Sequence, residues 1–269
     1  MYKAIFLDLD GTLFDDEKNV SIENKTAINM AEKKGVSVCL CSGRQKEFVK
    51  NIREKAGIDS QYIISSNGCE IYDLKNDEVL FSSNLEKSLV KKLYDYSEKQ
   101  NYLIRLDTVH ARYINKMEYE YSGEISLPDD VEKFINENNI IQVTICTKEE
   151  SEIDESIEYV NSLNEYVKIE NRYNAGSTYW NLWGINVINK NASKGNAIYG
   201  LCKYLNIDIK DSIAMGDDLN DISMIKQAGL GVAMGNALNE VKAIADEVTK
   251  NNNENGVAEI INSKILFLN

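Results

Sequence analysis

Two acidic motifs, each placed directly after a short apolar run, constrain the fold of this chain most. The motif DLDGT at residues 8–12 follows the apolar residues 4–7, and the motif GDDLND at residues 216–221 follows residues 212–215. A short apolar run that ends in acidic residues and glycine is typical of a buried parallel strand. Ligands of open α/β sheets bind at the carboxyl ends of such strands. The two motifs therefore predict a parallel sheet with a polar site at its carboxyl edge.

The carboxylates of these motifs indicate a metal site. Asp8 and Asp10 are two residues apart at a strand end, so both side chains can face one site. Converging carboxylates repel one another unless a hard cation lies among them, and oxygen ligands of this kind suit Mg²⁺. The alternatives are structural, namely an Asx turn after the first strand and capping of a helix by the second motif. The second motif offers more capping residues than one helix needs, so we expect at least Asp217 to bind metal.

The composition excludes some classes of partner. The 269 residues include 30 Lys and Arg against 43 Asp and Glu, which gives a formal net charge of −13. Nucleic acids and anionic membranes are bound through basic side chains, so we expect neither as a partner. A small phosphorylated substrate stays compatible with this charge, because a metal ion and a few local cations can reverse the field inside a cleft.

The cysteine pattern and the hydropathy pattern favour a cytoplasmic protein. The five cysteines (Cys39, Cys41, Cys69, Cys146 and Cys202) form no CxxC pair, and an odd, scattered set fits a reducing compartment. The apolar run after Lys3 is too short for a signal peptide, and no stretch has the length of a membrane-spanning helix. Cys39 and Cys41 share an expected strand and one of its faces, which favours burial.

Two parts of the chain alternate strands with helices, which predicts a doubly wound parallel sheet of the α/β class. The first part has expected strands at 4–8, 36–41 and 62–65, with a helix that Ser21 caps and that ends near Gly35, and a second helix that ends at Gly57. After residue 187 we expect helices at 194–205 and 219–227, and strands at 212–215, 230–233 and 247–249.

The middle of the chain follows a different pattern. Helices are expected at 85–100, 128–138 and 149–163, and strands at 102–106, 109–114, 140–147, 165–173 and 178–183. Neighbouring strands at 102–114 and 165–183 indicate hairpins, which are typical of an antiparallel sheet in an α+β unit. We therefore predict a core domain of residues 1–82 and 187–269, into which a domain of residues 83–186 is inserted.

Two weaker signals concern anion binding. Ser42 and Gly43 lie between an expected strand and an expected helix, where a hydroxyl and free backbone N–H groups can bind a small anion. Ser-Gly turns are common, so this pattern alone is weak. Lys194 opens the helix that returns the chain to the sheet, but a single lysine is usually a solvated surface residue.

The motifs in this order resemble those of the haloacid dehalogenase superfamily of phosphatases and phosphotransferases, and in particular its Cof-type branch with a type IIB cap. The matching stretches are IFLDLDGTL (5–13), CSGR (41–44), SSNGCEIY (65–72), SKGNAI (193–198), IAMGDDLNDISMIKQAGLGVAMGNALNEVKAIAD (213–246) and NGVAEII (255–261). They cover most of residues 1–75 and 186–262, whereas the middle segment matches by length and position only. Gln45 departs from the family, which often has proline there, and Asp218 occupies a variable position.

The resemblance implies catalytic and metal-binding roles. Asp8 would be the nucleophile that forms an aspartyl-phosphate, and Asp10 would be the general acid and base. Mg²⁺ would be held by Asp8, the backbone carbonyl of Asp10, and Asp217. Asp221 would orient these ligands from behind.

The resemblance also implies a phosphate-binding set. Ser42, the Gly43 amide and Lys194 would bind phosphoryl oxygens, and Asn220 would contact the phosphoryl group or Lys194. Four further residues receive structural interpretations. Arg44 is interpreted as an ion pair rather than a substrate contact, and His110 as a structural side chain rather than a metal ligand. Trp180 and Trp183 are interpreted as packing residues, with stacking on a substrate as the alternative.

The implied function is that of a cytoplasmic Mg²⁺-dependent phosphatase on small organic phosphates, such as sugar phosphates or phosphorylated cofactors. The inserted domain would be a mobile lid that carries substrate specificity, and the protein would be a monomer or a weak homodimer. One alternative is a phosphomutase on the same scaffold. Another is a non-catalytic protein that binds a phosphorylated ligand, which the presence of Asp8, Asp10, Lys194 and Asp217 disfavours.

Overall fold

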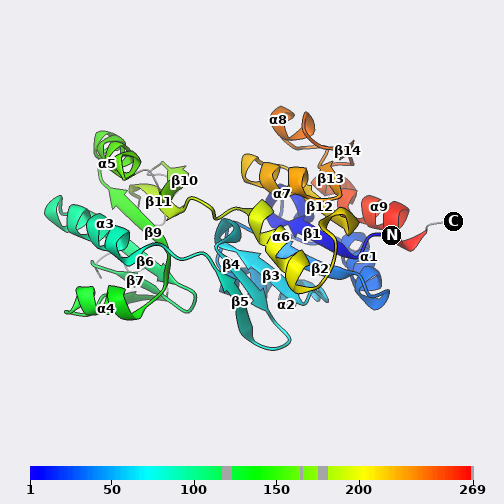
Figure 1. The fold of residues 1–269 in the computed structure, drawn as a ribbon. Helices are drawn as coiled ribbons and strands as arrows, with labels where there is room; N and C mark the ends of the chain where they lie inside the picture. Colours follow the sequence, from blue (N-terminus) through cyan, green and yellow to red (C-terminus); the bar gives the residue numbers. More distant parts are fainter. Residues whose placement is uncertain (117–122, 164–165, 175–180, 268–269) are drawn as a thin grey trace. The chain divides into compact units, whose positions relative to one another are not determined.

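The computed structural model describes residues 1–116, 123–163, 166–174 and 181–267, and its chain divides into two compact units (Figure 1). The core unit comprises Met1–Phe81 and Ala192–Asn269, and the inserted unit comprises Ser82–Asn191. The second break lies after Asn191 rather than after residue 186, because a strand of the inserted unit continues to Asn189. No described helix is both long enough and apolar enough to cross a membrane.

The core unit contains the doubly wound sheet that the alternating pattern predicts. Eight strands follow the order β14-β13-β12-β1-β2-β3-β4-β5. All neighbours from β14 to β3 are parallel, and β3 pairs antiparallel with β4. The strands are β1 (Ala4–Asp8), β2 (Ser37–Cys41), β3 (Tyr62–Ser65), β4 (Glu70–Asp73), β5 (Glu78–Ser82), β12 (Ser212–Gly216), β13 (Leu230–Ala233) and β14 (Glu247–Val248).

Alternation of side chains along β1 creates two apolar layers, one on each face of this sheet. Ile5 and Leu7 belong to one cluster, with residues of α1 (Ile22–Lys33) and α9 (Gly256–Ile261). Ala4 and Phe6 belong to the other cluster, with residues of α6 (Lys194–Tyr204) and Met224 of α7 (Ile222–Gln227). The remaining core helices are α2 (Lys46–Ala56) and α8 (Asn239–Lys242). Cys39 and Cys41 are both buried, as predicted from their shared strand.

Local chemistry sets the helix ends near the site. Ser21 caps α1 by accepting a hydrogen bond from the Asn24 N–H, as predicted. Helix α2 ends at Gly57, whose left-handed φ of +64° closes the helix. The helix predicted at 219–227 is a 3₁₀ turn at Leu219–Asp221 followed by α7, with Asp218 accepting a hydrogen bond from the Leu219 N–H. Asp218 of the second motif therefore caps this helical turn, which is the structural alternative considered for that motif.

The inserted unit has a six-stranded sheet in the order β10-β11-β9-β6-β7-β8. Its strands are β6 (Leu103–Thr108), β7 (Arg112–Ile114), β8 (Glu124–Ser126), β9 (Ile140–Thr147), β10 (Val167–Tyr173) and β11 (Trp183–Asn189). The antiparallel pair β6–β7 confirms the hairpin predicted at 102–114, and β10 pairs antiparallel with β11, which lies later in the chain than the strand predicted at 178–183. β11 begins at Trp183, where the strand predicted at 178–183 ends, and it continues through Ile185, Val187 and Ile188 to Asn189. Residues 178–180 of that prediction, with Trp180, lie outside the described residues.

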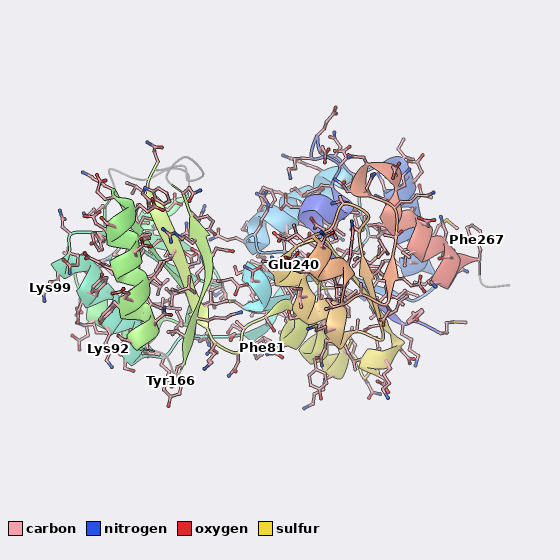
Figure 2. All side chains as sticks on the ribbon, turned by 90° about the horizontal axis from the view of Figure 1, so that it is seen from above. Phe81, Lys92, Lys99, Tyr166, Glu240 and Phe267 are labelled. Carbon is pink, nitrogen blue, oxygen red and sulfur yellow. The ribbon has the colours of Figure 1, made fainter. Side chains whose placement is uncertain are left out.

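Three helices cover one face of this second sheet: α3 (Lys87–Lys99), α4 (Val131–Glu137) and α5 (Glu150–Ser162). Leu89 and Leu93 of α3 pack with Ile104 and Val143 of the sheet, while exposed residues of the same helix, including Lys92, point outward (Figure 2). The sheet therefore has an apolar face under the helices, and its core is separate from the core of the other unit.

Candidate active site

The two acidic motifs meet because their strands are parallel neighbours. β1 pairs with β12, so Asp8 and Asp217 emerge at the same edge of the sheet. Gly11 turns the chain with φ +80°, and a Cβ atom there would lie 2.2 Å from Asp217 Oδ2. Glycine is therefore required at this position for both its conformation and its lack of a side chain. Thr12 donates a hydrogen bond from Oγ1 to Asp217 Oδ1 at 3.0 Å.

Asp221 is folded back beneath the second motif. Its Oδ2 accepts hydrogen bonds from the backbone N–H groups of Asp217 at 2.9 Å and Asp218 at 3.1 Å. A Cβ at Gly216 would lie 2.4 Å from the Cβ of Asp221, so only glycine allows this approach. Asp221 thereby fixes the loop that presents Asp217.

Lys194 joins the two motifs from a third element. It begins α6, and its Nζ lies 2.6 Å from Asp8 Oδ1 and 2.6 Å from Asp221 Oδ1. The side chain of Lys194 is fully buried, with 0% exposed. Burial lowers the pKa of Lys194, but the charges of Asp221 and Asp8 outweigh it and raise the pKa above its usual value. The lysine is thus a permanent cation in the middle of the site, rather than a surface residue.

The site has the donors of a metal centre. Asp8, Asp217 and Asp221 each offer an oxygen, and these oxygens lie within 4.8 Å of one another. Burial, followed by the charge of Asp221, raises the pKa of Asp8 against the opposing effect of Lys194. Burial and Asp221 also raise the pKa of Asp217 to about 6, although Thr12 opposes the shift. Crowded hard carboxylates of this kind match the oxygen ligands that Mg²⁺ prefers.

The carboxylate of Asp10 does not join this group. Arg44 donates to it from Nε at 2.6 Å and from Nη2 at 2.9 Å, and Lys18 Nζ donates at 2.9 Å. Burial alone would raise the pKa of Asp10. The hydrogen bonds from Arg44 and Lys18 have the larger combined effect, so the pKa lies below its usual value. The ion pair predicted for Arg44 is confirmed, and Asp10 is its partner.

The Ser42–Gly43 turn presents free hydrogen-bond donors. Ser42 is buried, and its Oγ accepts a hydrogen bond from the Arg44 N–H at 3.1 Å. Among the residues that the structure describes, neither the Ser42 hydroxyl hydrogen nor the Gly43 N–H has an acceptor. Since β2 is the parallel neighbour of β1, this turn lies at the same sheet edge as Asp8.

Asn220 binds a residue that the sequence analysis did not assign to the site. Its Nδ2 donates to Asn67 Oδ1 at 2.9 Å, and no bond to Lys194 is present within the described part of the chain. Asn67 belongs to the turn after β3, which pairs in parallel with β2. The signal that could have revealed Asn67 is its Ser-Asn-Gly turn directly after a predicted strand of the same sheet.

Two other residues of interest lie in the inserted unit. His110 is exposed on the turn between β6 and β7, where its backbone N–H donates to Thr108 Oγ1. Trp183 packs against the core of the inserted unit, and the Arg172 guanidinium lies 5.8 Å from the centre of its ring.

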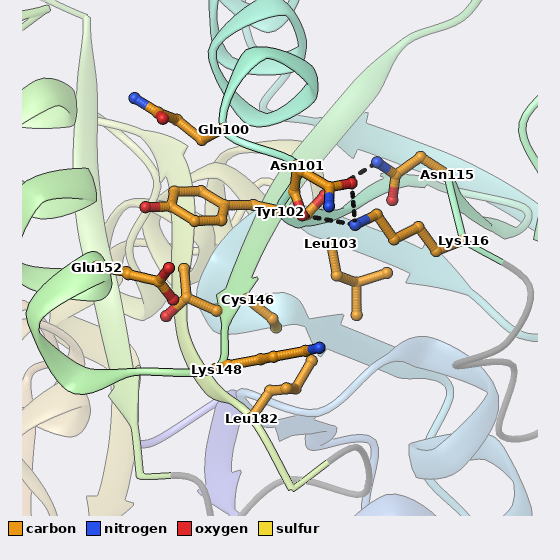
Figure 3. Close-up of a pocket in the computed structure, with 11 residues that line it drawn as sticks. Gln100, Asn101, Tyr102, Leu103, Asn115, Lys116, Cys146, Lys148, Glu152 and Leu182 are labelled. Carbon is orange, nitrogen blue, oxygen red and sulfur yellow. Dashed lines mark hydrogen bonds between the residues drawn. The ribbon is translucent and has the colours of Figure 1, made fainter.

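The inserted unit has a polar pocket of about 480 Å³ at one end of its sheet (Figure 3). Tyr102, Cys146 and Lys148 are among its lining residues, and Lys116 donates to the Asn101 carbonyl at 2.5 Å. None of the predicted site residues lines it. All eight lie in the core unit: Asp8, Asp10, Ser42, Gly43, Lys194, Asp217, Asn220 and Asp221.

Comparison with known proteins identifies the family. The sequence model of the haloacid dehalogenase-like hydrolases matches residues 5–261. Phosphatase YwpJ of Bacillus subtilis is 30% identical, over 96% of this chain and 98% of that protein. The 5-amino-6-(5-phospho-D-ribitylamino)uracil phosphatase YcsE of the same organism is 32% identical, over 98% and 96%. A solved haloacid dehalogenase-like hydrolase from B. subtilis superposes with a TM-score of 0.77, at 27% identity, over 98% of this chain and all of that one. The chain therefore belongs to the haloacid dehalogenase-like hydrolase family.

Proposed function

We propose that the protein is a Mg²⁺-dependent phosphatase that hydrolyses small organic phosphate monoesters through an aspartyl-phosphate on Asp8. The observation that carries the proposal is the buried group of Asp8, Lys194, Asp217 and Asp221 at the carboxyl edge of the sheet. The similarity to proteins named as phosphatases supports the same reaction class.

Asp8 is suited to the role of nucleophile. Its side chain lies at the end of β1 with 8% exposed, and Lys194 binds only its Oδ1 in the described contacts. Oδ2 is therefore the oxygen that can attack phosphorus. Burial favours the protonated acid, so the adjacent cation of Lys194 is needed to keep this carboxylate ionised.

The donor set fits a magnesium ion, for which Asp8 and Asp217 would be the side-chain ligands, with the backbone carbonyl of Asp10. A bound Mg²⁺ would neutralise negative charge, so that a carboxylate and a phosphate dianion can approach each other. Asp221 would not need to bind the ion, because its two oxygens already hold Lys194 and the backbone of residues 217 and 218. Its contribution would be to orient Asp217 and Lys194.

The phosphoryl oxygens would be bound by donors that the fold leaves free. The Ser42 hydroxyl and the Gly43 N–H have no described acceptor, and Lys194 has three N–H groups, of which the described contacts use two. These donors come from the turn after β2, the parallel neighbour of β1, and from the first residue of α6. They would stabilise the charge that spreads over the phosphoryl oxygens during transfer.

Asp10 would act as the general acid and base, two residues after the nucleophile. It would protonate the leaving oxygen and then remove a proton from the attacking water. Arg44 and Lys18 hold its carboxylate as an anion in this structure. We therefore infer that Asp10 must leave at least one of these partners before it can donate a proton.

The inserted unit, which was predicted to span residues 83–186, would select the substrate, because the eight predicted site residues lie outside it. The YcsE relative is named for a phosphorylated ribityl compound, so phosphate esters of sugars and sugar alcohols are the first substrates to test. Cytoplasmic location, a monomeric or weakly dimeric state, and the absence of nucleic-acid and membrane partners stay predictions.

A panel of phosphate esters, each incubated with the protein and Mg²⁺, tests the proposal through the inorganic phosphate that is released. We expect turnover of a generic aryl phosphate and higher kcat/KM for one class of sugar or sugar-alcohol phosphate. Isomerised product without free phosphate would instead indicate a phosphomutase. Absence of both products across the panel, with a folded protein that binds phosphate, would indicate a binding protein.

A further inference from the structure

The turn between β3 and β4 has an unusual backbone. Ser66, Asn67 and Gly68 all have positive φ angles, at +48°, +55° and +91°. Left-handed conformations disfavour most side chains, and asparagine and glycine are the residues that adopt them most readily. The turn is nevertheless buried, with Asn67 only 3% exposed. Three consecutive left-handed residues in a buried turn persist only where the surroundings hold them.

This turn contacts each of the elements that carry the proposed phosphate donors. The Asn67 N–H donates to the Ser42 carbonyl at 3.1 Å. A Cβ at Gly43 would lie 2.8 Å from Asn67 Oδ1 and 3.2 Å from its Nδ2, so the carboxamide lies directly against Gly43. On the other side, a Cβ at Gly68 would lie 2.2 Å from the carbonyl oxygen that precedes Lys194.

The side chain of Asn67 uses only its oxygen in the described hydrogen bonds. Its Oδ1 accepts from Asn220 at 2.9 Å, whereas the two N–H groups of its Nδ2 have no acceptor among the described residues. The Nδ2 atom is accessible to solvent, so its acceptor has to come from water or from a ligand. The free donors next to it, Ser42 Oγ–H and Gly43 N–H, indicate that the missing acceptor is an anion.

We propose that Asn67 is a further substrate-contacting residue, whose Nδ2 donates a hydrogen bond to an oxygen of the phosphate group. This inference rests on the proposed function. The β3–β4 turn would be the fourth segment that contacts the phosphate, besides the turn after β2, helix α6 and the turn that carries Asn220. Asn220 holds the Asn67 carboxamide by its oxygen, and both Oδ1 and Nδ2 of that carboxamide lie next to Gly43.

A purely structural role makes a different prediction for one substitution. Asn67→Asp keeps the side-chain shape, keeps an oxygen for the Asn220 amide, and tolerates the left-handed conformation. It replaces the Nδ2 donor with a carboxylate oxygen. A structural tie should survive this change in stability. Because the new carboxylate also repels an anion, the neutral Asn67→Gly must lose phosphate affinity as well if Asn67 donates to the anion. Asn206→Asp is the matched control, because Asn206 also has a left-handed φ, at +56°, and is exposed after α6.

The experiment measures the binding of inorganic phosphate by calorimetry in the presence of Mg²⁺, together with kcat and KM for an aryl phosphate. We expect Asn67→Asp to weaken phosphate binding by about 10- to 100-fold, the effect of losing a hydrogen bond to a charged group. Its thermal midpoint should stay close to that of Asn206→Asp, whose phosphate affinity should equal that of the wild type. Asn67→Gly, which relaxes the backbone and removes the donor, should weaken binding by about tenfold.

Phosphate binding within twofold of the wild type in Asn67→Asp would overturn the inference. If Asn67→Asp does not fold, the same criterion applies to Asn67→Gly. Wild-type protein that neither binds phosphate nor releases it from any ester would instead contradict the proposed function. The two failures are thus separate, because the first requires an active wild-type enzyme.

Discussion

Replacement of Lys194 by methionine is the sharpest test of how the site is built. The ammonium group of Lys194 lies 2.6 Å from a carboxylate oxygen of Asp8 and 2.6 Å from one of Asp221. The exposed fractions of the three side chains are 0%, 8% and 0%. Lys194→Met keeps an unbranched side chain of similar length, so the main loss is the cation between two buried anions.

The magnitude follows from the burial of the partners. Loss of one member of a buried ion pair destabilises a protein by about 3–5 kcal/mol, because the charge left behind has neither water nor a partner. Methionine fills most of the vacated volume, which keeps the cavity contribution small. We therefore expect the free energy of unfolding to fall by about 3–5 kcal/mol and turnover to be lost.

Urea denaturation at pH 7 without divalent metal measures this change. Lys203→Met, on an exposed position of the same helix, is the matched control and should change stability by less than about 0.5 kcal/mol. Adding Asp221→Asn to Lys194→Met removes one unpaired anion, so the double variant should recover at least about 1 kcal/mol. A loss below about 1 kcal/mol for Lys194→Met, or no recovery in the double variant, would refute the buried triad as the organising contact of the site.

Three further outcomes are expected. Asp10→Asn should reduce phosphoryl transfer by about 10²–10⁴-fold for a sugar phosphate and by less for an aryl phosphate, whose leaving group needs little protonation; equal losses in single-turnover rates would contradict the acid role. Mg²⁺ should raise the thermal midpoint of the wild type and should fail to do so in Asp217→Asn, and a chelator should abolish turnover; activity in metal-free buffer would argue against the ion. Burial raises the pKa of Glu32 from 4.5 to about 7, although the Val38 N–H opposes it, so wild-type stability should fall as pH rises through this range. In urea denaturation, the free energy of unfolding of Glu32→Gln relative to that of the wild type should therefore rise by about 1 kcal/mol from pH 5 to pH 8. This figure is discounted because the carboxyl is only half-buried. The same difference at both pH values would show that Glu32 does not titrate in this range.

The central strands could be predicted because the apolar composition of these segments indicates that they are buried. β1 is an apolar run that ends in Asp8 and β13 is a short apolar run after Gly229, and both have the predicted bounds. β4 was not predicted, because its sequence EIYD places Glu70 and Asp73 in buried positions. Ser65 donates to Glu70 at 2.7 Å and Gln61 donates to Asp73 at 3.1 Å, so partners on and next to the paired strand β3 make these buried acids tolerable. Such compensation depends on tertiary structure and is invisible in a local pattern.

The sequence predicted part of the site in the same way. The parallel-strand rule places Asp8 and Asp217 at one edge, and the structure has them there. The burial of Lys194 could not be inferred from residue type, because lysines are mostly exposed and its environment is created by Asp221, 27 positions away in sequence. The partner of Arg44 and the position of Asn67 depend in the same way on contacts between separate loops.

Turnover by Asp8→Asn tests the central claim most directly. The substitution removes the nucleophilic oxygen and a metal ligand with almost no change in volume, and an Asn oxygen can still accept from Lys194. With an aryl phosphate and Mg²⁺, we predict kcat below detection in a variant whose circular dichroism spectrum matches the wild type. Retention of a tenth of the wild-type kcat or more, in protein free of wild-type contamination, would contradict the assignment of Asp8 as the residue that attacks phosphorus.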